Sequence, residues 1–203
     1  MTEQFWHDAV TEKSFAFLQE LAKRFQFVLI GGWAVYFYTK ALKSKDIDII
    51  VTFEELQSMR TQFDLIKNER LKKYEIKAEG FDVDIYTPHF SELGLPLDDV
   101  IREAVSFDGF CLPRKETMLA LKLYVYEQRK GSLKGKKDMI DVISLLYYGK
   151  ISSKLIKDTL ERHRLKALNK SLREILAAMY EVKELGLNRK TFADFKKPLL
   201  AAL

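Results

Sequence analysis

The hydrophobic pattern divides the chain into a first half of mixed helices and strands and a second half of helices. Apolar residues at helical spacing predict early helices over residues 5–24, 33–41 and 53–70. Short apolar or alternating runs predict strands over residues 25–30, 46–52, 72–78, 81–86 and 107–112. Later helical periodicity covers residues 115–129, 137–148, 153–163 and 166–185. We therefore predict an α+β fold, in which helices flank a mixed β-sheet core and the C-terminal region is helical.

A domain boundary is expected near Pro113, the proline that closes the last predicted strand. Residues 1–112 then form a sheet-and-helix core domain with an N-terminal helix, and residues 113–203 form a helical region. No glycine-, proline- or serine-rich linker separates the two.

Composition excludes several classes of protein. The 203 residues are 47% apolar and 31% charged, which is typical of a globular chain. One cysteine excludes an intramolecular disulfide framework and a cysteine-rich zinc site, and the three histidines are scattered along the sequence. The longest apolar stretch is residues 27–38, whereas a membrane helix needs about 20 residues. With no basic secretory signal at the N-terminus, we expect a cytoplasmic protein without a membrane partner.

Charge is distributed unevenly along the chain. Residues 1–100 contain 12 basic and 17 acidic residues, whereas residues 101–203 contain 22 basic and 12 acidic residues. The net charges are therefore −5 and +10. This asymmetry favours an acidic element in the first half and a surface for a polyanion in the second, although a solvated helical surface would give the same pattern.

The candidate chemistry begins at a glycine pair and a pair of aspartates. Gly31 and Gly32 follow an apolar strand and precede a helix, where a glycine backbone and the helix N-terminus can approach a phosphate closely. Asp46 and Asp48 alternate with isoleucines, so both carboxylates lie on one strand face. Such close carboxylates favour a hard divalent cation such as Mg²⁺ (or Mn²⁺), completed by substrate phosphates.

A third carboxylate from a neighbouring strand would allow a second metal ion. Asp82 and Asp84 share one face of the predicted strand 81–86. We favour Asp84, because it is flanked by Val83 and Ile85 and lies farther from the turn at Gly80; Asp82 stays open as the alternative.

This combination resembles the DNA polymerase beta-like nucleotidyltransferase superfamily. The family pattern is an apolar residue, two small residues, a spacer and then alternating acidic and apolar residues. Here it is matched by Ile30-Gly31-Gly32 and by Asp46-Ile47-Asp48-Ile49, and Ser44 stands where many members have threonine or serine.

The second half adds a more specific likeness. A lysine within an apolar helix, an arginine near its end, a basic loop and a Lys-Asp-x-x-Asp motif resemble the abortive-infection toxin (AbiEii) branch of the superfamily. The matching positions are Lys122, Arg129, Lys137, Asp138 and Asp141. The resemblance covers about residues 25–148.

The resemblance implies a role for each matched residue. Gly31 and Gly32 would bind the triphosphate of an NTP, with Ser44 beside them, and Asp46 and Asp48 would bind the metal ions. Lys122 would contact phosphate or assist the attack, and Asp138 would orient Lys122 or the acceptor.

Lys122 and Asp138 also have interpretations from their local sequence. Lys122 lies between leucines, where a buried ammonium needs an anionic partner, unless the side chain extends to solvent at the helix edge. Asp138 would equally suit a helix N-terminus.

The implied activity is metal-dependent transfer of a nucleoside monophosphate from an NTP to an acceptor hydroxyl. In the toxin-like branch the acceptors include tRNA 3′ ends, and a cognate antitoxin protein is the implied partner. A basic cluster fits an RNA acceptor: Arg129, Lys130, Lys134, Lys136 and Lys137. The alternatives are the same chemistry on a small molecule, as in antibiotic-modifying members, or on a protein, and a non-catalytic regulatory member of the fold.

Overall fold

The computed structural model describes residues 2–203, with side chains from Asp8 onward. The chain forms two compact units. The first runs to Arg114 without Tyr38–Leu42, and the second contains Tyr38–Leu42 and Lys115–Leu203. Within the described residues, no helix combines the length and the apolar character that crossing a membrane requires.

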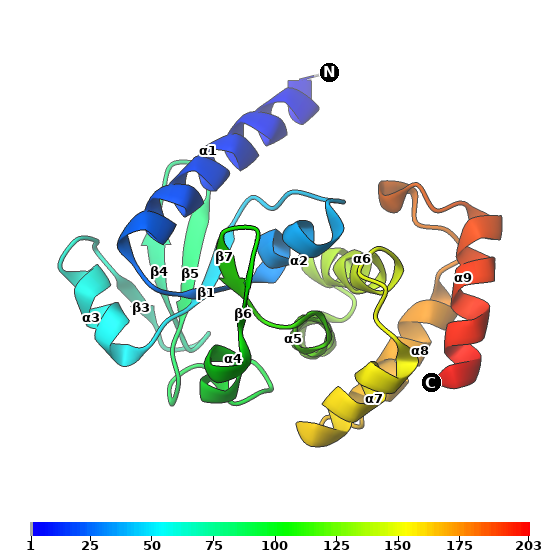
Figure 1. The fold of residues 1–203 in the computed structure, drawn as a ribbon. Coiled ribbons are helices and arrows are strands. Elements are labelled where there is room, and N and C mark those ends of the chain that lie inside the picture. Colours follow the sequence, from blue (N-terminus) through cyan, green and yellow to red (C-terminus); the bar gives the residue numbers. More distant parts are fainter. Residues whose placement is uncertain (1) are drawn as a thin grey trace. The chain divides into compact units, whose positions relative to one another are not determined.

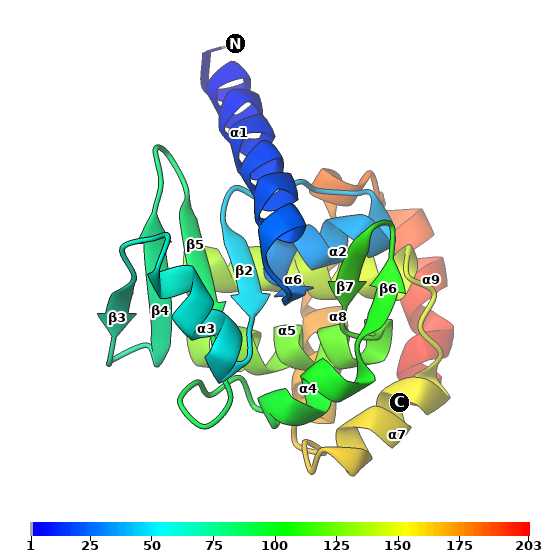
Figure 2. The ribbon, with the colours of Figure 1, turned by 60° about the vertical axis from the view of Figure 1, so that its left-hand side comes forward.

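A five-stranded mixed sheet forms the centre of the first unit (Figures 1 and 2). Its spatial order is β1 (Val28–Ile30), β2 (Ile47–Ile50), β5 (Asp82–Tyr86), β4 (Lys73–Lys77) and β3 (Ile66–Asn68). The β2–β5 pair is parallel, and the other neighbours are antiparallel. This mixed sheet with its helices confirms the predicted α+β class.

Alternation along the central strands separates an apolar face from a carboxylate face. Ile47 and Ile49 are fully buried, and Val83 and Ile85 of the neighbouring strand are buried on the same face. Residues two apart on a strand share a face, so the aspartates between these residues lie on the opposite face. The local pattern thus positions the candidate site.

Four helices of the chain before Lys115 are α1 (Thr2–Arg24), α2 (Gly31–Thr39), α3 (Phe53–Arg60) and α4 (Leu97–Glu103). Aromatic contacts hold α1 in place: the Phe17 ring packs edge-on against Phe63 and Phe81. The indole nitrogen of Trp33 donates a hydrogen bond to the Ser14 hydroxyl. Helix α2 begins at the glycine pair itself, two residues before the predicted start.

The predicted helix over 53–70 is wrong in its second half. Helix α3 ends at Arg60, and residues 66–68 form β3 instead. This strand pairs in antiparallel register with β4, the next strand along the chain, which provides partners for its backbone N–H and C=O groups. Helix α4 was not predicted.

The predicted strand over 107–112 is a hairpin. β6 (Val105–Phe107) and β7 (Phe110–Leu112) pair around Asp108 and Gly109, which both have positive φ angles of 51° and 83°. An Asp-Gly pair in this conformation makes the two-residue turn that matches the strand twist.

The second unit is helical beyond Arg114. Its elements are α5 (Lys115–Arg129), α6 (Leu133–Tyr147), α7 (Ser153–Arg162), α8 (Leu168–Ala178), the short 3-10 helix η1 (Lys183–Leu185) and α9 (Arg189–Ala202). Helix α6 begins before the predicted residue 137, because the Ser132 hydroxyl caps it by accepting the Gly135 N–H. The basic loop expected between the predicted helices 115–129 and 137–148 therefore lies mostly within the first turn of α6.

The predicted helix over 166–185 is also interrupted. The chain becomes extended at Met179, where α8 ends, and Val182 forms an isolated bridge with Leu187. This bridge buries Val182 and Leu187. Helix α9 lies beyond the predicted elements.

Candidate active site

The turn from β1 to α2 brings the chain into close contact with an aspartate. Ile30 pairs with Asp48 in the sheet, and Gly31 follows with a φ of 67°. A Cβ atom at Gly31 would lie 2.0 Å from Asp48 Oδ2. Because only glycine leaves this volume open, Gly31 makes room for the carboxylate. Gly32 is buried in the first turn of α2.

Two carboxylates lie side by side at the centre of the sheet. Asp48 of β2 and Asp84 of β5 are directly paired in the parallel register. The Tyr86 hydroxyl donates a long hydrogen bond of 3.5 Å to Asp48 Oδ1. Burial, and then the charge of Asp48, raise the pKa of Asp84 to about 6, against the opposing effect of Lys73. The pair is therefore strained electrostatically.

Lys73 of β4 is the cation beside Asp84. Its Nζ lies 2.6 Å from Asp84 Oδ2 and 3.0 Å from Glu75 Oε1. Burial lowers the pKa of Lys73, but hydrogen bonds and charges from the two carboxylates outweigh it and raise the pKa overall. Sequence reasoning missed Lys73. The signal was the alternation of Lys73, Glu75 and Lys77 in the predicted strand 72–78.

Asp46 and Asp82 form a separate, more exposed pair. Asp46 Oδ1 accepts the backbone N–H of Asp82 at 3.1 Å, and Asp82 Oδ2 lies 3.1 Å from Lys77 Nζ. Among the side chains that the structure describes, from Asp8 onward, no three histidine, cysteine or acidic residues are close enough to hold a metal ion as they stand. The register thus brings Asp48 to Asp84, whereas Asp46 is engaged with Asp82.

A divalent cation fits the Asp48–Asp84 pair. Asp84 Oδ1 is buried and has no hydrogen-bond partner among the described residues. An unsatisfied carboxylate oxygen next to a second carboxylate is the donor set that Mg²⁺ prefers. Asp48 therefore suits the metal-binding role that the sequence resemblance implies, and Asp84 suits the role of third carboxylate for which the strand pattern favoured it.

Ser44 stabilises the loop that precedes β2. It is buried, and its hydroxyl donates to the Asp46 backbone carbonyl at 3.0 Å. The hydroxyl therefore fixes the loop that delivers Asp46 to the start of the strand.

A second ionic cluster lies within the helical unit. Lys122 of α5 lies 2.7 Å from Asp141 Oδ2 and 3.3 Å from Asp138 Oδ1, both on α6. Arg129 reaches Asp138 Oδ2 at 3.5 Å. The Lys122, Asp138 and Asp141 side chains are only 10%, 5% and 3% exposed. The structure thus supplies anionic partners for the buried ammonium.

The helix-terminus interpretation of Asp138 is wrong, because Ser132 caps α6 and Asp138 lies in its interior. The aspartate instead joins α6 to α5 through Lys122 and Arg129.

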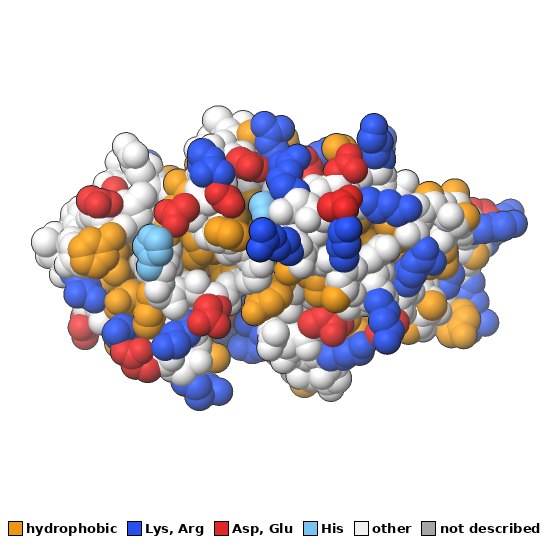
Figure 3. All heavy atoms as spheres, turned by 90° about the horizontal axis from the view of Figure 1, so that it is seen from below, with side chains coloured by type: hydrophobic (Ala, Val, Ile, Leu, Met, Phe, Trp, Pro, Cys, Tyr) orange, Lys and Arg blue, Asp and Glu red, His pale blue; other side chains and the backbone are white. Residues whose placement is uncertain are grey.

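The basic cluster of the sequence is partly neutralised. Lys130 lies 2.5 Å from Glu174, and Lys136 lies 3.9 Å from Glu184. Lys134 and Lys137 are exposed on α6. On the molecular face drawn in Figure 3, acidic side chains likewise lie among the lysines and arginines.

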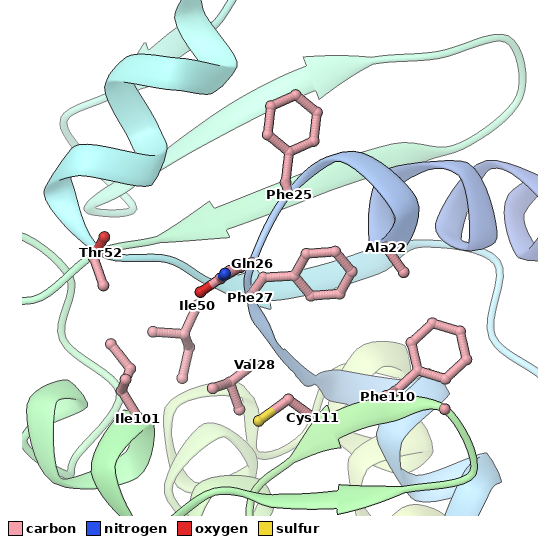
Figure 4. Close-up of a pocket in the computed structure, with 11 residues that line it drawn as sticks. Ala22, Phe25, Gln26, Phe27, Val28, Ile50, Thr52, Ile101, Phe110 and Cys111 are labelled. Carbon is pink, nitrogen blue, oxygen red and sulfur yellow. The ribbon is translucent and has the colours of Figure 1, made fainter.

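A separate pocket of about 390 Å³ lies at the β1 edge of the sheet (Figure 4). It is lined by Ala22, Phe25, Gln26, Phe27, Val28, Ile50, Thr52, Ile101, Gly109, Phe110 and Cys111. No lining residue is charged, so the pocket offers no carboxylate to a metal ion. The candidate active site is therefore the carboxylate pair and not this cavity.

Comparison with known proteins supports the fold assignment. No family model matches the sequence, and no curated protein matches it. Among solved structures, the chain is similar to a Helicobacter pylori protein assigned as a nucleotidyltransferase, with a TM-score of 0.52 and 14% identity over 94% of this chain and 93% of that one. It is also similar to JHP933 from Helicobacter pylori, with a TM-score of 0.51 and 15% identity over 99% of this chain and 93% of that one. At these identities the likeness shows a nucleotidyltransferase-like fold.

Replacing Gly31 tests the close approach to Asp48. We expect Gly31→Ala to destabilise the protein by about 1–3 kcal/mol more than Gly109→Ala, because overpacking adds to the backbone cost. Gly109 is the matched control: its φ is also positive, at 83°, but nothing lies within 4 Å of its missing Cβ. Urea unfolding measures both variants. Equal losses of stability would contradict the proposed contact.

Replacing Lys122 tests the buried ionic cluster. Lys122→Met leaves Asp138 and Asp141 buried without their shared cation, so we expect a loss of about 3–5 kcal/mol in unfolding free energy. The double variant Lys122→Met/Asp141→Leu should recover part of that loss, since it removes one of the stranded charges. Chemical denaturation followed by circular dichroism gives both values. Wild-type stability in Lys122→Met would show that the cluster does not stabilise the fold.

Proposed function

We propose that this protein is a metal-dependent nucleotidyltransferase that moves a nucleoside monophosphate from an NTP to an acceptor hydroxyl and releases pyrophosphate. The observation that carries the proposal is the paired Asp48 and Asp84 carboxylates beside the Gly31 turn. The nucleotidyltransferase-like fold supports it.

Asp48 and Asp84 would hold the metal, Mg²⁺ or Mn²⁺. When bound, the cation neutralises negative charge on the carboxylates and on the substrate phosphates. Asp46 lies directly before β2, and its carboxylate accepts the backbone N–H of Asp82. Its role as a further metal ligand therefore stays a prediction.

The remaining residues position the substrate. The first N–H groups of an α-helix have no partner within the helix, and they favour an anion. Helix α2 begins at Gly31, so these groups adjoin the carboxylate pair through the Gly31–Asp48 contact. We assign the NTP phosphates to this turn, including Gly32. In the reaction, the acceptor hydroxyl loses its proton to solvent, its oxygen bonds to the α-phosphorus, and the bond between the α-phosphorus and pyrophosphate breaks. The phosphate contact of Lys122 stays a prediction.

We propose RNA as the acceptor, with a tRNA 3′ end as the member that the toxin-like resemblance suggests. The net charge of +10 over residues 101–203 supports a polyanion, and Lys134 and Lys137 are exposed cations for it. The resemblance also suggests a cognate antitoxin protein as partner.

A small-molecule acceptor is the second candidate. It is favoured by the acidic partners of Lys130 and Lys136, which reduce the positive charge available to a nucleic acid.

Carboxylate variants test the chemistry. We expect Asp48→Asn and Asp84→Asn each to lower turnover by at least about 100-fold, a usual loss for one preorganised charged group. Asp82→Asn is the matched control on the same strand face and should retain most of the activity. The assay incubates each labelled NTP with Mg²⁺ and total RNA and measures label on RNA.

The outcomes separate the alternatives. An inactive Asp82→Asn with an active Asp84→Asn would show that the third carboxylate is Asp82. Wild-type protein that transfers no label to RNA, small molecules or protein would favour the non-catalytic member of the fold.

Salt dependence tests the acceptor. Each phosphate contact to single-stranded RNA contributes a slope of about −0.7 in log affinity against log salt. If Lys134 and Lys137 each contact a phosphate, their contribution weakens binding by roughly sevenfold between about 50 and 200 mM salt. The variant Lys134→Ala/Lys137→Ala should therefore show a shallower slope in an RNA-binding titration. Identical slopes, with transfer intact on a small acceptor, would reject RNA contact at these lysines and favour the small-molecule candidate.

A further inference from the structure

The carboxylate face of the sheet carries a row of charges that alternate in sign. From Asp82 the row passes to Lys77, Glu75, Lys73 and Asp84, with successive nitrogen–oxygen distances of 3.1, 2.8, 3.0 and 2.6 Å. The row ends at Asp84, which is paired in register with Asp48. Lys73 is therefore the last cation of the row before the proposed metal-binding pair.

Lys73 is held firmly in this position. Its side chain is 11% exposed, and its ammonium lies between Asp84 and Glu75. Glu75 is itself fixed by Lys77 and by the Asn68 amide, which donates to Oε1 at 3.0 Å. Hydrogen bonds from Lys77, and then from Lys73 and Asn68, hold the pKa of Glu75 at about 2 despite the opposing effect of burial. Glu75 is thus a permanent anion that keeps Lys73 in place.

The contact with Lys73 gives the two carboxylate oxygens of Asp84 different surroundings. Oδ2 binds Lys73 at 2.6 Å, whereas Oδ1 is buried without a hydrogen-bond partner among the described residues. A carboxylate with one oxygen fixed by a charged donor cannot rotate freely, and its second oxygen stays available for another ligand.

We propose that Lys73 is a positioning residue of the nucleotidyl-transfer site, which holds Asp84 Oδ2 so that Oδ1 is left for the divalent cation. This inference rests on the proposed function. The positive charge of Lys73 has a second consequence, because it repels the cation that Asp84 helps to bind. Lys73 therefore orients the ligand and at the same time weakens metal binding.

Loss of Lys73 should therefore change metal affinity and turnover in opposite directions. A residue with only a structural role would lower both. In Lys73→Met, we expect Mn²⁺ to bind on the order of tenfold more tightly, because one nearby positive charge is gone. Turnover should fall by about 10–100-fold, the usual cost of losing a residue that orients a metal ligand. A lysine that served only the packing of the sheet would loosen the site when removed and weaken Mn²⁺ binding.

The measurement is a titration of the full-length protein with Mn²⁺ alone, without nucleotide, followed by electron paramagnetic resonance of the free ion. Lys77→Met is the matched control, since Lys77 lies four residues along the strand on the same face as Lys73 but contacts Glu75 and Asp82 instead of Asp84. Its Mn²⁺ affinity should stay close to that of wild type. Lys73→Arg keeps the charge and should restore near-wild-type affinity.

A further variant keeps the test decisive if Lys73→Met does not fold. Lys73→Gln removes the charge and retains a donor toward Asp84, and we expect it also to bind Mn²⁺ more tightly. Thermal unfolding establishes that each variant is folded. Unchanged or weaker Mn²⁺ binding in the folded uncharged variants overturns the inference.

The same titration distinguishes this inference from the proposed function. If Asp48→Asn and Asp84→Asn bind Mn²⁺ as well as wild type does, the metal site itself is wrong, and the role of Lys73 fails with it. If both lose Mn²⁺ while Lys73→Met and Lys73→Gln bind it as wild type does, the metal site stands and only the role of Lys73 is rejected.

Discussion

The parallel register of β2 and β5 places the Asp48 and Asp84 carboxylates directly beside each other. Burial and the neighbouring charge of Asp48 both disfavour the charged form of Asp84, so the pKa of Asp84 is raised to about 6. A sheet selected only for stability has no need of this pair. The surrounding features, from the missing side chain at Gly31 to the buried ammonium of Lys73, accommodate it.

Each accommodation comes from a different element. The β1–α2 turn supplies a residue without a Cβ, which leaves the volume that the Asp48 carboxylate occupies. The β4 strand supplies Lys73, whose charge offsets part of the repulsion at Asp84. Electrostatic strain that the fold tolerates at one place is typical of a functional site, because a ligand can relieve it.

The helical unit also contains buried charges, but there they connect two helices. Lys122 shares its charge between Asp138 and Asp141, and the three groups join α5 to α6. A slipped pairing of α5 and α6 would leave these buried charges without partners, which is costly. Among the described residues, buried carboxylate oxygens without a hydrogen-bond partner occur in both units: Asp84 Oδ1 in the first, and Asp138 Oδ2 and Asp141 Oδ2 in the second. In the second unit, Arg129 and Lys122 lie within ion-pair distance of these oxygens.

Local patterns allowed much of the fold to be predicted. Residues 115–129 form a helix with the predicted bounds, and the predicted strand over 81–86 lies within one residue of β5. Both segments combine clear periodicity with local boundary signals, so neighbouring residues decide their structure. The predicted helix over 53–70 was wrong beyond Arg60, where α3 ends, because residues 66–68 pair as a strand with β4, which follows after only four residues.

The sequence by itself determined which residues could share a strand face, because side chains alternate with a period of two. It therefore indicated Asp46, Asp48 and Asp84 as candidate residues. The turn chemistry indicated Gly31 and Gly32 and predicted a helix after the glycines. Only the tertiary structure decided that Asp48 pairs with Asp84, that Asp46 is engaged with Asp82, and that Lys73 joins the site. The reason is that strand register depends on hydrogen bonds between segments far apart in the chain, and a shift of one residue would turn every one of these side chains to the other face.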